Sequence, residues 1–179
     1  MGVVDSQTHV RDPISSETPH GHTWVRIGDG KLAIGHRPRL RNLARLKQGG
    51  CTHVVTILSE KEGALAIRDA CATQGLAWIW LPLPTADPPG RERRKTILAT
   101  FVQLRELLEG SACLFMHCSG GIHRTGMLMN AFLRFLGYSE SEAASILRTL
   151  RETTLNGLHA HHLEWAKHFV PPAGAAQDS

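Results

Sequence analysis

Apolar residues recur with two different periods along the chain, and segments of the two kinds alternate. Short runs of apolar and β-branched residues predict buried strands, and longer segments with apolar positions three or four residues apart predict helices. The expected strands cover residues 24–27, 31–34, 52–58, 77–81 and 111–116, and the expected helices cover residues 40–46, 62–73, 91–108, 127–136, 140–151 and 157–169. Strands that alternate with helices indicate an α/β fold, a single domain with a mainly parallel central sheet flanked by helices.

Turn and capping residues refine this plan. Gly28-Asp29-Gly30 is a strong turn signal, so the first two strands are expected to form a hairpin. Ser139 and Glu142 have the spacing of a capping box, and Asn156 is placed to cap the last helix. The expected organisation is a flexible polar lead at 1–22, one domain at 23–170 and a loose tail at 171–179.

The composition is that of an ordinary globular protein, with 179 residues, 42% hydrophobic and 20% charged, which suffices for one sizeable core. No run of about 18 apolar residues exists, so no membrane span is expected. The four cysteines have no even spacing, which argues against a disulfide framework and for a reducing, cytoplasmic location. Residues 1–6 fit the N-myristoylation pattern at Gly2, but no polybasic second signal follows.

The charge pattern bears on partners. A net charge of +4 and a pI near 9.1 favour acidic ligands. Aromatic residues are 6% of the chain and do not interleave with the basic runs, so no nucleic-acid partner is expected. The Arg37–Arg45 cluster (Arg37, Arg39, Arg41, Arg45) and the Arg91–Lys95 cluster (Arg91, Arg93, Arg94, Lys95) either attract an anionic substrate or form solvated charged surfaces.

Histidines near the C-terminus do not predict a metal site. His159, His161, His162 and His168 mostly cannot face one another around a helix, and no acid or thiol joins them at ligand spacing. We therefore expect neither a metal nor another cofactor.

The segment His117-Cys118-Ser119-Gly120-Gly121-Ile122-His123-Arg124-Thr125-Gly126 joins a predicted strand to a predicted helix. Backbone N–H groups at a helix N-terminus lack intrahelical partners and attract anions. Gly120 and Gly121 let the loop curl so that its amides point inward, and Arg124 can hold two oxygens of one phosphate. The residues expected to bind phosphate are Ser119, Gly120, Gly121, Ile122, His123 and Arg124.

Cys118 is the candidate nucleophile of this loop. A thiol at a helix N-terminus beside an arginine ionises more readily than a free thiol, so the sequence predicts a reactive thiolate. A lone cysteine beside a glycine turn would ordinarily be structural. Here five residues separate Cys118 from Arg124 at a strand-to-helix junction, and this combination favours catalysis.

The pattern His-Cys, five residues, Arg-Thr-Gly from His117 to Gly126 resembles the signature of the cysteine-dependent protein tyrosine phosphatases, and within them the small dual-specificity phosphatases. The resemblance implies a dual-specificity phosphatase-like fold and an enzyme in which Cys118 attacks phosphorus and forms a phosphocysteine intermediate. It further implies that Arg124 and the loop amides hold the equatorial oxygens. Thr125 would hydrogen-bond the thiolate, and His117 would support the loop from behind.

The resemblance also implies an aspartic acid on a mobile loop before the cysteine. Asp87 lies 31 residues before Cys118 and is the sole carboxylate of the Pro/Gly-rich loop 82–90, so it is the candidate general acid and then general base. Its alternative role is that of a turn residue before Pro88. The family has an asparagine or similar residue after the last long helix that braces the phosphate loop. Asn156 stands in that place, with helix capping as the alternative.

Within this resemblance two substrate classes stay open. The chain is shorter than tyrosine-specific domains and its one tyrosine, Tyr138, lies outside the loop, so we expect a shallow pocket for phosphotyrosine, phosphoserine and phosphothreonine in proteins. The alternative is a small substrate, an inositol phosphate or pyrophosphate. His123 before Arg124 resembles a plant and fungal group that acts on inositol pyrophosphates, although Ile122 stands where that group has lysine.

Two hypotheses from other classes remain. A rhodanese-like sulfurtransferase also carries a loop cysteine near a helix, but it leaves Arg124, Thr125 and Asp87 unexplained. A catalytically silent phosphate-binding module would keep the amides and lose the chemistry, and the presence of Cys118 and Asp87 argues against it. The sequence does not indicate an oligomeric state.

Overall fold

A computed structural model describes residues 15–17 and 21–171 of the chain. The strands are β1 (Ser15–Glu17), β2 (Thr23–Ile27), β3 (Gly30–Gly35), β4 (His53–Thr56), β5 (Ala77–Trp80) and β6 (Cys113–His117). The helices are α1 (Leu43–Gln48), α2 (Ala64–Thr73), α3 (Arg91–Glu109), α4 (His123–Phe135), α5 (Glu140–Asn156) and α6 (Ala160–Ala166), with short 3-10 turns η1 (Leu40–Asn42), η2 (Glu60–Glu62) and η3 (Lys167–Phe169).

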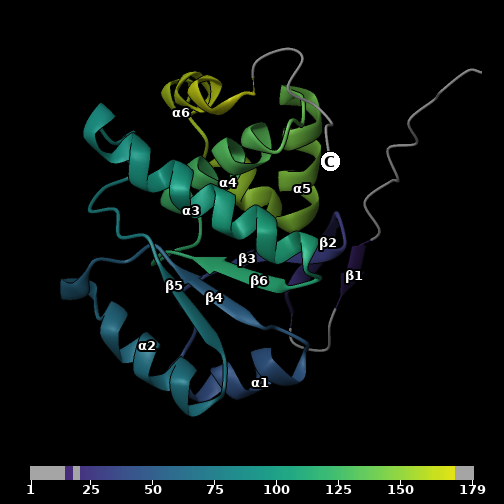
Figure 1. Cartoon of the computed structure of the whole chain (residues 1–179), viewed down its shortest axis with the longest axis vertical. Coiled ribbons are helices and arrows are strands. Elements are labelled where there is room, and N and C mark those ends of the chain that lie inside the picture. The colour runs from purple at the N-terminus through teal and green to yellow at the C-terminus, as the bar shows by residue number, and fades with distance from the viewer. Residues whose placement is uncertain (1–14, 18–20, 172–179) are drawn as a thin grey trace, which may run out of the picture.

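One sheet organises the described chain, in the strand order β1-β2-β3-β6-β4-β5. β1, β2 and β3 pair antiparallel, whereas β3, β6, β4 and β5 run parallel. Figure 1 shows α1 and α2 on one face of the sheet and α3 to α6 on the other. The carboxyl ends of β3, β4 and β6 meet at one edge, where Gly35 and Thr56 both lie opposite His117. In parallel sheets this edge is where ligands bind.

Each face of the sheet is covered by its own apolar layer. Val55 and Met116 contribute to the layer beneath α3 to α6, and Val54 and Phe115 to the layer above α1 and α2. Successive strand residues point to opposite faces, so strands buried on both faces need continuous apolar runs. This explains why these strands lack an apolar and polar alternation. α4 lies at the centre of its layer and buries the nine residues Thr125–Leu133.

The structure confirms the predicted α/β class, the mainly parallel sheet and the hairpin of β2 and β3. It also confirms the capping box, since Ser139 N–H donates to Glu142 Oε2 at 2.7 Å and Glu142 N–H donates to Ser139 Oγ at 3.3 Å. Most elements lie within a few residues of their predicted ranges.

The C-terminal helices differ from the expectation. α5 continues past Arg151, whose φ of −172° and ψ of 107° kink the helix, and it ends at Asn156. The prediction that Asn156 caps the last helix is wrong, because α6 begins at Ala160 and His159 is its N-cap. Arg151, at the kink, and Thr154, after it, contact the loop that follows Cys118.

The terminal segments are described in part. Ser15–Glu17, within the predicted lead, pairs with β2 as β1. Gly2, the residue of the myristoylation pattern, and residues 172–179 of the predicted tail lie outside the described residues. No helix in the described ranges is both long and apolar enough to span a membrane.

Candidate active site

The loop between β6 and α4 holds the Cys118 thiol against a backbone amide. Cys118 follows the last residue of β6, is 3% exposed, and its Sγ accepts a hydrogen bond from Gly121 N–H at 3.2 Å. Ser119 to Ile122 form the turn, and α4 starts at His123 with Ile122 as its N-cap. The sulfur therefore lies at the N-terminal end of a 13-residue helix, where an anion is stabilised.

Gly121 is required by the shape of this loop. Its φ is +63°, a conformation that favours glycine, and a Cβ at this position would collide with the carbonyl oxygen of Gly35. The loop thus packs directly on the end of β3. Arg37 N–H, just beyond β3, donates to Ser119 O at 3.0 Å and ties the loop to this segment at a second point.

Arg124 is oriented by a carboxylate that lies far away in the sequence. Its Nη1 and Nη2 donate to the two carboxylate oxygens of Glu62 at 2.8 and 2.7 Å, and Nη1 also donates to Leu83 O at 3.0 Å. The pKa of Arg124 is raised, first by its hydrogen bond to Glu62 and more weakly by Cys118. A guanidinium has five N–H donors, so donors remain for an anion beside Cys118.

Glu62 was missed by the sequence analysis, which placed it at the start of a helix. It ends η2, and its Oε2 accepts from both Ser59 N–H and Ser59 Oγ at 2.9 and 2.8 Å. Hydrogen bonding to Arg124, and then to Ser59, lowers the pKa of Glu62 to about 2. The signal that indicates this residue is the Ser59 to Glu62 spacing of a capping box directly after β4.

His117 supports the loop through a buried chain of hydrogen bonds. Its Nδ1 lies 3.1 Å from Cys118 O and its Nε2 lies 2.9 Å from Thr56 Oγ1. A carbonyl can only accept, so Nδ1 carries the proton and Nε2 accepts from the Thr56 hydroxyl. Trp78 Nε1 completes the chain by donating to Thr56 Oγ1 at 2.9 Å. Burial lowers the pKa of His117 to about 4, so the ring is neutral.

The brace expected of Asn156 is made by two other residues of α5. Thr154 is buried and its Oγ1 donates to Gly121 O at 2.7 Å. Arg151 Nη1 donates to Gly120 O and Gly121 O at 3.0 and 3.1 Å. Asn156 is exposed, and the described structure gives its side chain no hydrogen bond. Asn156 lies two residues after Thr154 in α5. Side chains two residues apart point to different sides of a helix, so Asn156 does not face the loop as Thr154 does.

Thr125 and His123 differ from their expected contacts. Thr125 Oγ1 is buried and has no hydrogen-bond partner within the described chain, whereas the resemblance implied a bond to the thiol. His123 is exposed, and its Nδ1 donates to Gly157 O at 3.0 Å. The His123 ring therefore anchors the loop to the end of α5. Its backbone lies in the first turn of α4, the end of the helix that attracts an anion.

The loop that carries Asp87 is tied to the rest of the site by its backbone. Arg124 binds Leu83 O, and the buried His162 of α6 donates from Nε2 to Ala86 O at 2.9 Å. The Nδ1 of His162 accepts from His159 N–H at 3.1 Å, so this ring is neutral in the observed arrangement. Asp87 itself is exposed, and its N–H donates to Thr85 Oγ1 at 3.3 Å.

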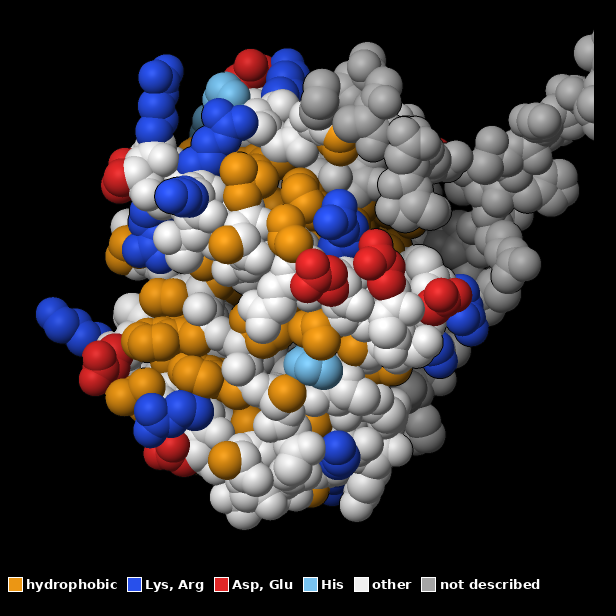
Figure 2. All heavy atoms as spheres, in the orientation of Figure 1, with side chains coloured by type: hydrophobic (Ala, Val, Ile, Leu, Met, Phe, Trp, Pro, Cys, Tyr) orange, Lys and Arg blue, Asp and Glu red, His pale blue; other side chains and the backbone are white. Residues whose placement is uncertain are grey.

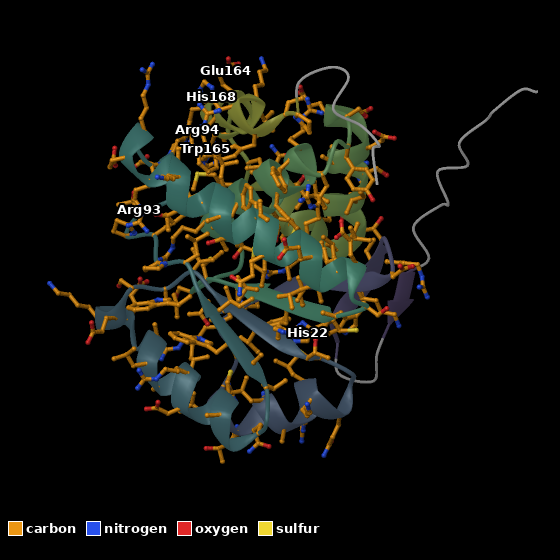
Figure 3. The ribbon with its side chains drawn as sticks, viewed as in Figure 1. His22, Arg93, Arg94, Glu164, Trp165 and His168 are labelled. Carbon is orange, nitrogen blue, oxygen red and sulfur yellow. The ribbon has the colours of Figure 1, made fainter. Side chains whose placement is uncertain are left out.

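The Arg91–Lys95 cluster lies at the start of α3. Figure 2 shows Lys and Arg side chains gathering over this end of α3 and near α6. Arg93 donates to Pro82 O at 2.7 Å, and Arg94 donates to His168 O at 2.6 Å. Figure 3 shows Arg94, Trp165 and His168 together, where they line a cavity of about 490 Å³. Two of these cations thus hold neighbouring backbone segments.

Cys51 and Cys71 are free thiols buried in the described structure. Burial raises the pKa of Cys51 to about 12 and that of Cys71 to about 11, so both stay protonated at neutral pH. His123 stacks on His159 with ring centres 5.8 Å apart. Among the described residues no group of three or more His, Cys, Asp or Glu side chains is arranged to hold a metal ion.

Solved structures of several phosphatases share this fold. Tk-PTP in its active form is 23% identical, with a TM-score of 0.66, covering 80% of this chain and 94% of that one. Kinase associated phosphatase, solved with its catalytic cysteine changed to serine, is 16% identical with a TM-score of 0.71, covering 86% and 96%. TpbA of P. aeruginosa in complex with pTyr is 16% identical with a TM-score of 0.56, covering 93% of each.

The sequence itself decides the family. No curated protein matches it. Residues 19–168 match the family described as the Swiss Army Knife protein, DSP-PTPase phosphatase domain. This match covers strands β2 to β6, the Cys118 loop and helices α1 to α6, and it leaves out β1. The chain therefore belongs to the DSP-PTPase phosphatase domain family, and is a small dual-specificity phosphatase-like member of the cysteine-dependent tyrosine phosphatase superfamily.

Proposed function

We propose that this protein hydrolyses phosphate monoesters through a phosphocysteine intermediate, with phosphotyrosine in proteins as its best substrate and phosphoserine and phosphothreonine as weaker ones. The main support for the proposal is that the Cys118 sulfur, the Gly121 amide and the Arg124 guanidinium lie together. The Cys118 sulfur accepts from the Gly121 amide at 3.2 Å, and Arg124 is held beside it by both carboxylate oxygens of Glu62.

In the first step the Cys118 sulfur attacks phosphorus in line, a sulfur–phosphorus bond forms and the ester oxygen leaves with its electron pair. Asp87 gives its proton to that oxygen. The inward amides of the loop and the open N–H donors of Arg124 hold the three equatorial oxygens as charge builds on them. Glu62 and Leu83 O keep the guanidinium in place, so little reorganisation is needed.

In the second step water attacks the phosphocysteine, and Asp87, now ionised, takes a proton from that water. The sulfur–phosphorus bond breaks and the electron pair returns to Cys118. His117 keeps the loop backbone fixed through both steps, since its Nδ1 proton is directed at Cys118 O.

A first experiment compares hydrolysis of p-nitrophenyl phosphate by the wild type, Cys118→Ser and Arg124→Lys. We expect turnover by the wild type that vanadate inhibits, and loss of turnover in both variants, because serine lacks an ionised nucleophile and lysine lacks the planar fork. Phosphate binding to Cys118→Ser should stay close to that of the wild type, since the amides and Arg124 remain. A Cys118→Ser protein with a tenth of the wild-type rate would refute the covalent route, and a wild type without turnover would leave a phosphate-binding module.

Two features favour phosphotyrosine: the length of its side chain and the small positive charge of the Cys118 loop. An aromatic arm is longer than the side chain of phosphoserine, so it reaches the buried sulfur more easily. The loop from Ser119 to His123 contains no lysine, and it therefore suits a single phosphoryl group. TpbA, which shares the fold, was solved in complex with pTyr.

The alternative substrate, an inositol phosphate or pyrophosphate, gains support from one observation. Arg37, the first residue of the Arg37–Arg45 cluster, lies against the Cys118 loop, since its N–H donates to Ser119 O. Competition between a phosphotyrosine peptide and inositol hexakisphosphate or its pyrophosphates separates the two. A higher kcat/KM for the inositol compound would overturn the protein-phosphatase assignment.

A further inference from the structure

A cationic pocket is lined in part by Arg37, whose N–H binds the Cys118 loop. It has a volume of about 420 Å³ and is lined by His22, His36, Arg37, Pro38, Arg39, Asn42, Arg45 and Leu46. His22, labelled in Figure 3, forms one wall. We call this cavity the Arg39 pocket.

The positive charge of the Arg39 pocket is not neutralised by the described chain. No carboxylate lines it, and none of the ion pairs among the described residues involves Arg39 or Arg45. Both side chains are exposed. In the Arg91–Lys95 cluster, by contrast, Arg93 and Arg94 hold backbone carbonyls. Arg39 and Arg45 are thus available to an external anion, and a concave site focuses their field.

Arg37 connects the Arg39 pocket to the catalytic loop. Its N–H binds Ser119 O, the residue after Cys118, and its Nη1 donates at 2.7 Å to the carbonyl of Glu62, the residue that orients Arg124. The charge of Arg37 also helps to lower the pKa of His117, after burial and a hydrogen bond that acts in the opposite direction. The Arg39 pocket therefore shares Arg37 with the edge of the sheet that carries the Cys118 loop.

From this arrangement we infer that the Arg39 pocket binds a second phosphoryl group of a substrate whose scissile phosphate occupies the Cys118 loop. The inference deepens the proposed function and rests on it. Arg39 and Arg45 supply guanidinium groups, which grip phosphate oxygens two at a time. The second phosphoryl group belongs to a doubly phosphorylated peptide or to a polyphosphorylated ring, and the experiment separates these sources.

The test compares four substrates with three proteins. The substrates are p-nitrophenyl phosphate, a phosphotyrosine peptide, the same peptide with phosphoserine one to four residues away, and inositol hexakisphosphate. The proteins are the wild type, the Arg39→Ala/Arg45→Ala double variant, and Arg41→Ala. Arg41 is the matched control, because it is an exposed arginine of the same segment that does not line the pocket.

We expect the wild type to prefer at least one substrate with several phosphates over its singly phosphorylated counterpart. The double variant should lose roughly 10- to 100-fold in kcat/KM on that substrate, mostly through KM, as befits the loss of charge-assisted hydrogen bonds. Its kcat/KM for p-nitrophenyl phosphate should stay within about twofold of the wild type, because that substrate does not reach the pocket. Arg41→Ala should match the wild type throughout.

Loss confined to the peptide arm identifies a peptide source, and loss confined to the inositol arm identifies a small-molecule source. Equal kcat/KM for singly and multiply phosphorylated substrates, or a preference that survives in the double variant, overturns the inference. Calorimetric titration of Cys118→Ser with inositol hexakisphosphate and with the doubly phosphorylated peptide needs no turnover. If the affinity for neither ligand falls when Arg39 and Arg45 are replaced by alanine, the inferred role of the Arg39 pocket is wrong. This result is independent of p-nitrophenyl phosphate hydrolysis, which tests the proposed function.

Discussion

At the scale of single residues, the orientation of Arg124 depends on Glu62. Glu62 is held by two bonds from Ser59 and in turn holds two of the Arg124 nitrogens. An arginine free to rotate would lose entropy each time it closed on a phosphate, so the pair places the cation in advance.

Replacing Glu62 by Gln tests this pairing. The amide keeps the shape and removes the charge, so kcat/KM for p-nitrophenyl phosphate should fall roughly 10- to 100-fold, the value of a charge-assisted pair. The control is Glu60→Gln, an exposed carboxylate of the same turn that forms no ion pair in the described chain. A rate within about twofold of the wild type for Glu62→Gln would mean that Leu83 O alone orients Arg124.

His117 makes stability depend on pH. Its pKa is about 4 in the folded protein and 6.5 for an ordinary histidine. Between these values the unfolded chain binds a proton that the folded chain does not, so stability falls as the pH drops from about 6.5 to about 4. The total effect is on the order of 3 kcal/mol.

Urea unfolding of the wild type and of His117→Asn at pH values across that window measures this effect. The asparagine amide can replace the Nδ1–H bond to Cys118 O but does not titrate. We expect the stability difference between the two proteins to shrink as the pH falls. Parallel pH dependences would show that His117 takes up a proton without penalty in the folded state.

The sequence predicts the two proposed catalytic residues, which are close together, and does not indicate the distant residue that orients one of them. Cys118 and Arg124 fall within one loop, so their spacing alone predicts that they meet. Glu62 lies 62 residues before Arg124, and the local pattern around it describes a helix start equally well. The missing information was that the ends of β4 and β6 adjoin in the sheet.

At the scale of elements, α5 braces the phosphate loop after its kink. Thr154 and Arg151 both bind the carbonyl of Gly121, and Arg151 Nη2 also donates to His36 Nε2 at 2.6 Å. The helical pattern of the sequence contains no glycine or proline that would indicate the kink at Arg151. The expected brace was assigned to Asn156, whereas the bracing residues Arg151 and Thr154 lie five and two residues earlier in the chain.

Thr154→Val is the test of this brace. Valine matches the shape of threonine and removes the donor to Gly121 O, so affinity for phosphate or vanadate should fall about fivefold, the worth of one buried hydrogen bond. Thr153→Val, at an exposed neighbouring position, serves as the control and should bind normally. Equal affinities of the two variants would show that Arg151 suffices.

The loop that carries Asp87 is the second element of the proposed site, and the proposed acid role of Asp87 can be tested with substrates that differ in their leaving group. Asp87→Asn should lower kcat on phenyl phosphate by roughly 10²- to 10⁴-fold, with a much smaller loss on p-nitrophenyl phosphate, whose leaving group needs no proton. The basic limb of the pH profile should also disappear. A basic limb unchanged in Asp87→Asn would assign the acid to a residue outside this loop.

At the scale of the whole molecule, the sheet collects segments that are distant in the sequence. The ends of β3, β4 and β6 bring Arg37, Glu62 and the Cys118 loop to one edge, and α5 closes that edge from the helical face. The alternation of strands and helices predicts such an edge. It does not predict which surface cations face it, because exposed arginines carry no periodic signal, and the Arg39 pocket became apparent from the structure.

The most direct test of the proposed covalent mechanism is detection of the phosphocysteine. The wild type and Asp87→Asn are mixed with p-nitrophenyl phosphate, quenched in acid within the first turnover and digested for mass spectrometry, with Cys118→Ser as the control. We predict one added phosphoryl group on the peptide that contains Cys118, more of it in Asp87→Asn because the second step lacks its base, and none in Cys118→Ser. Turnover by the wild type without any such adduct under single-turnover conditions, together with continued turnover by Cys118→Ser, would contradict it.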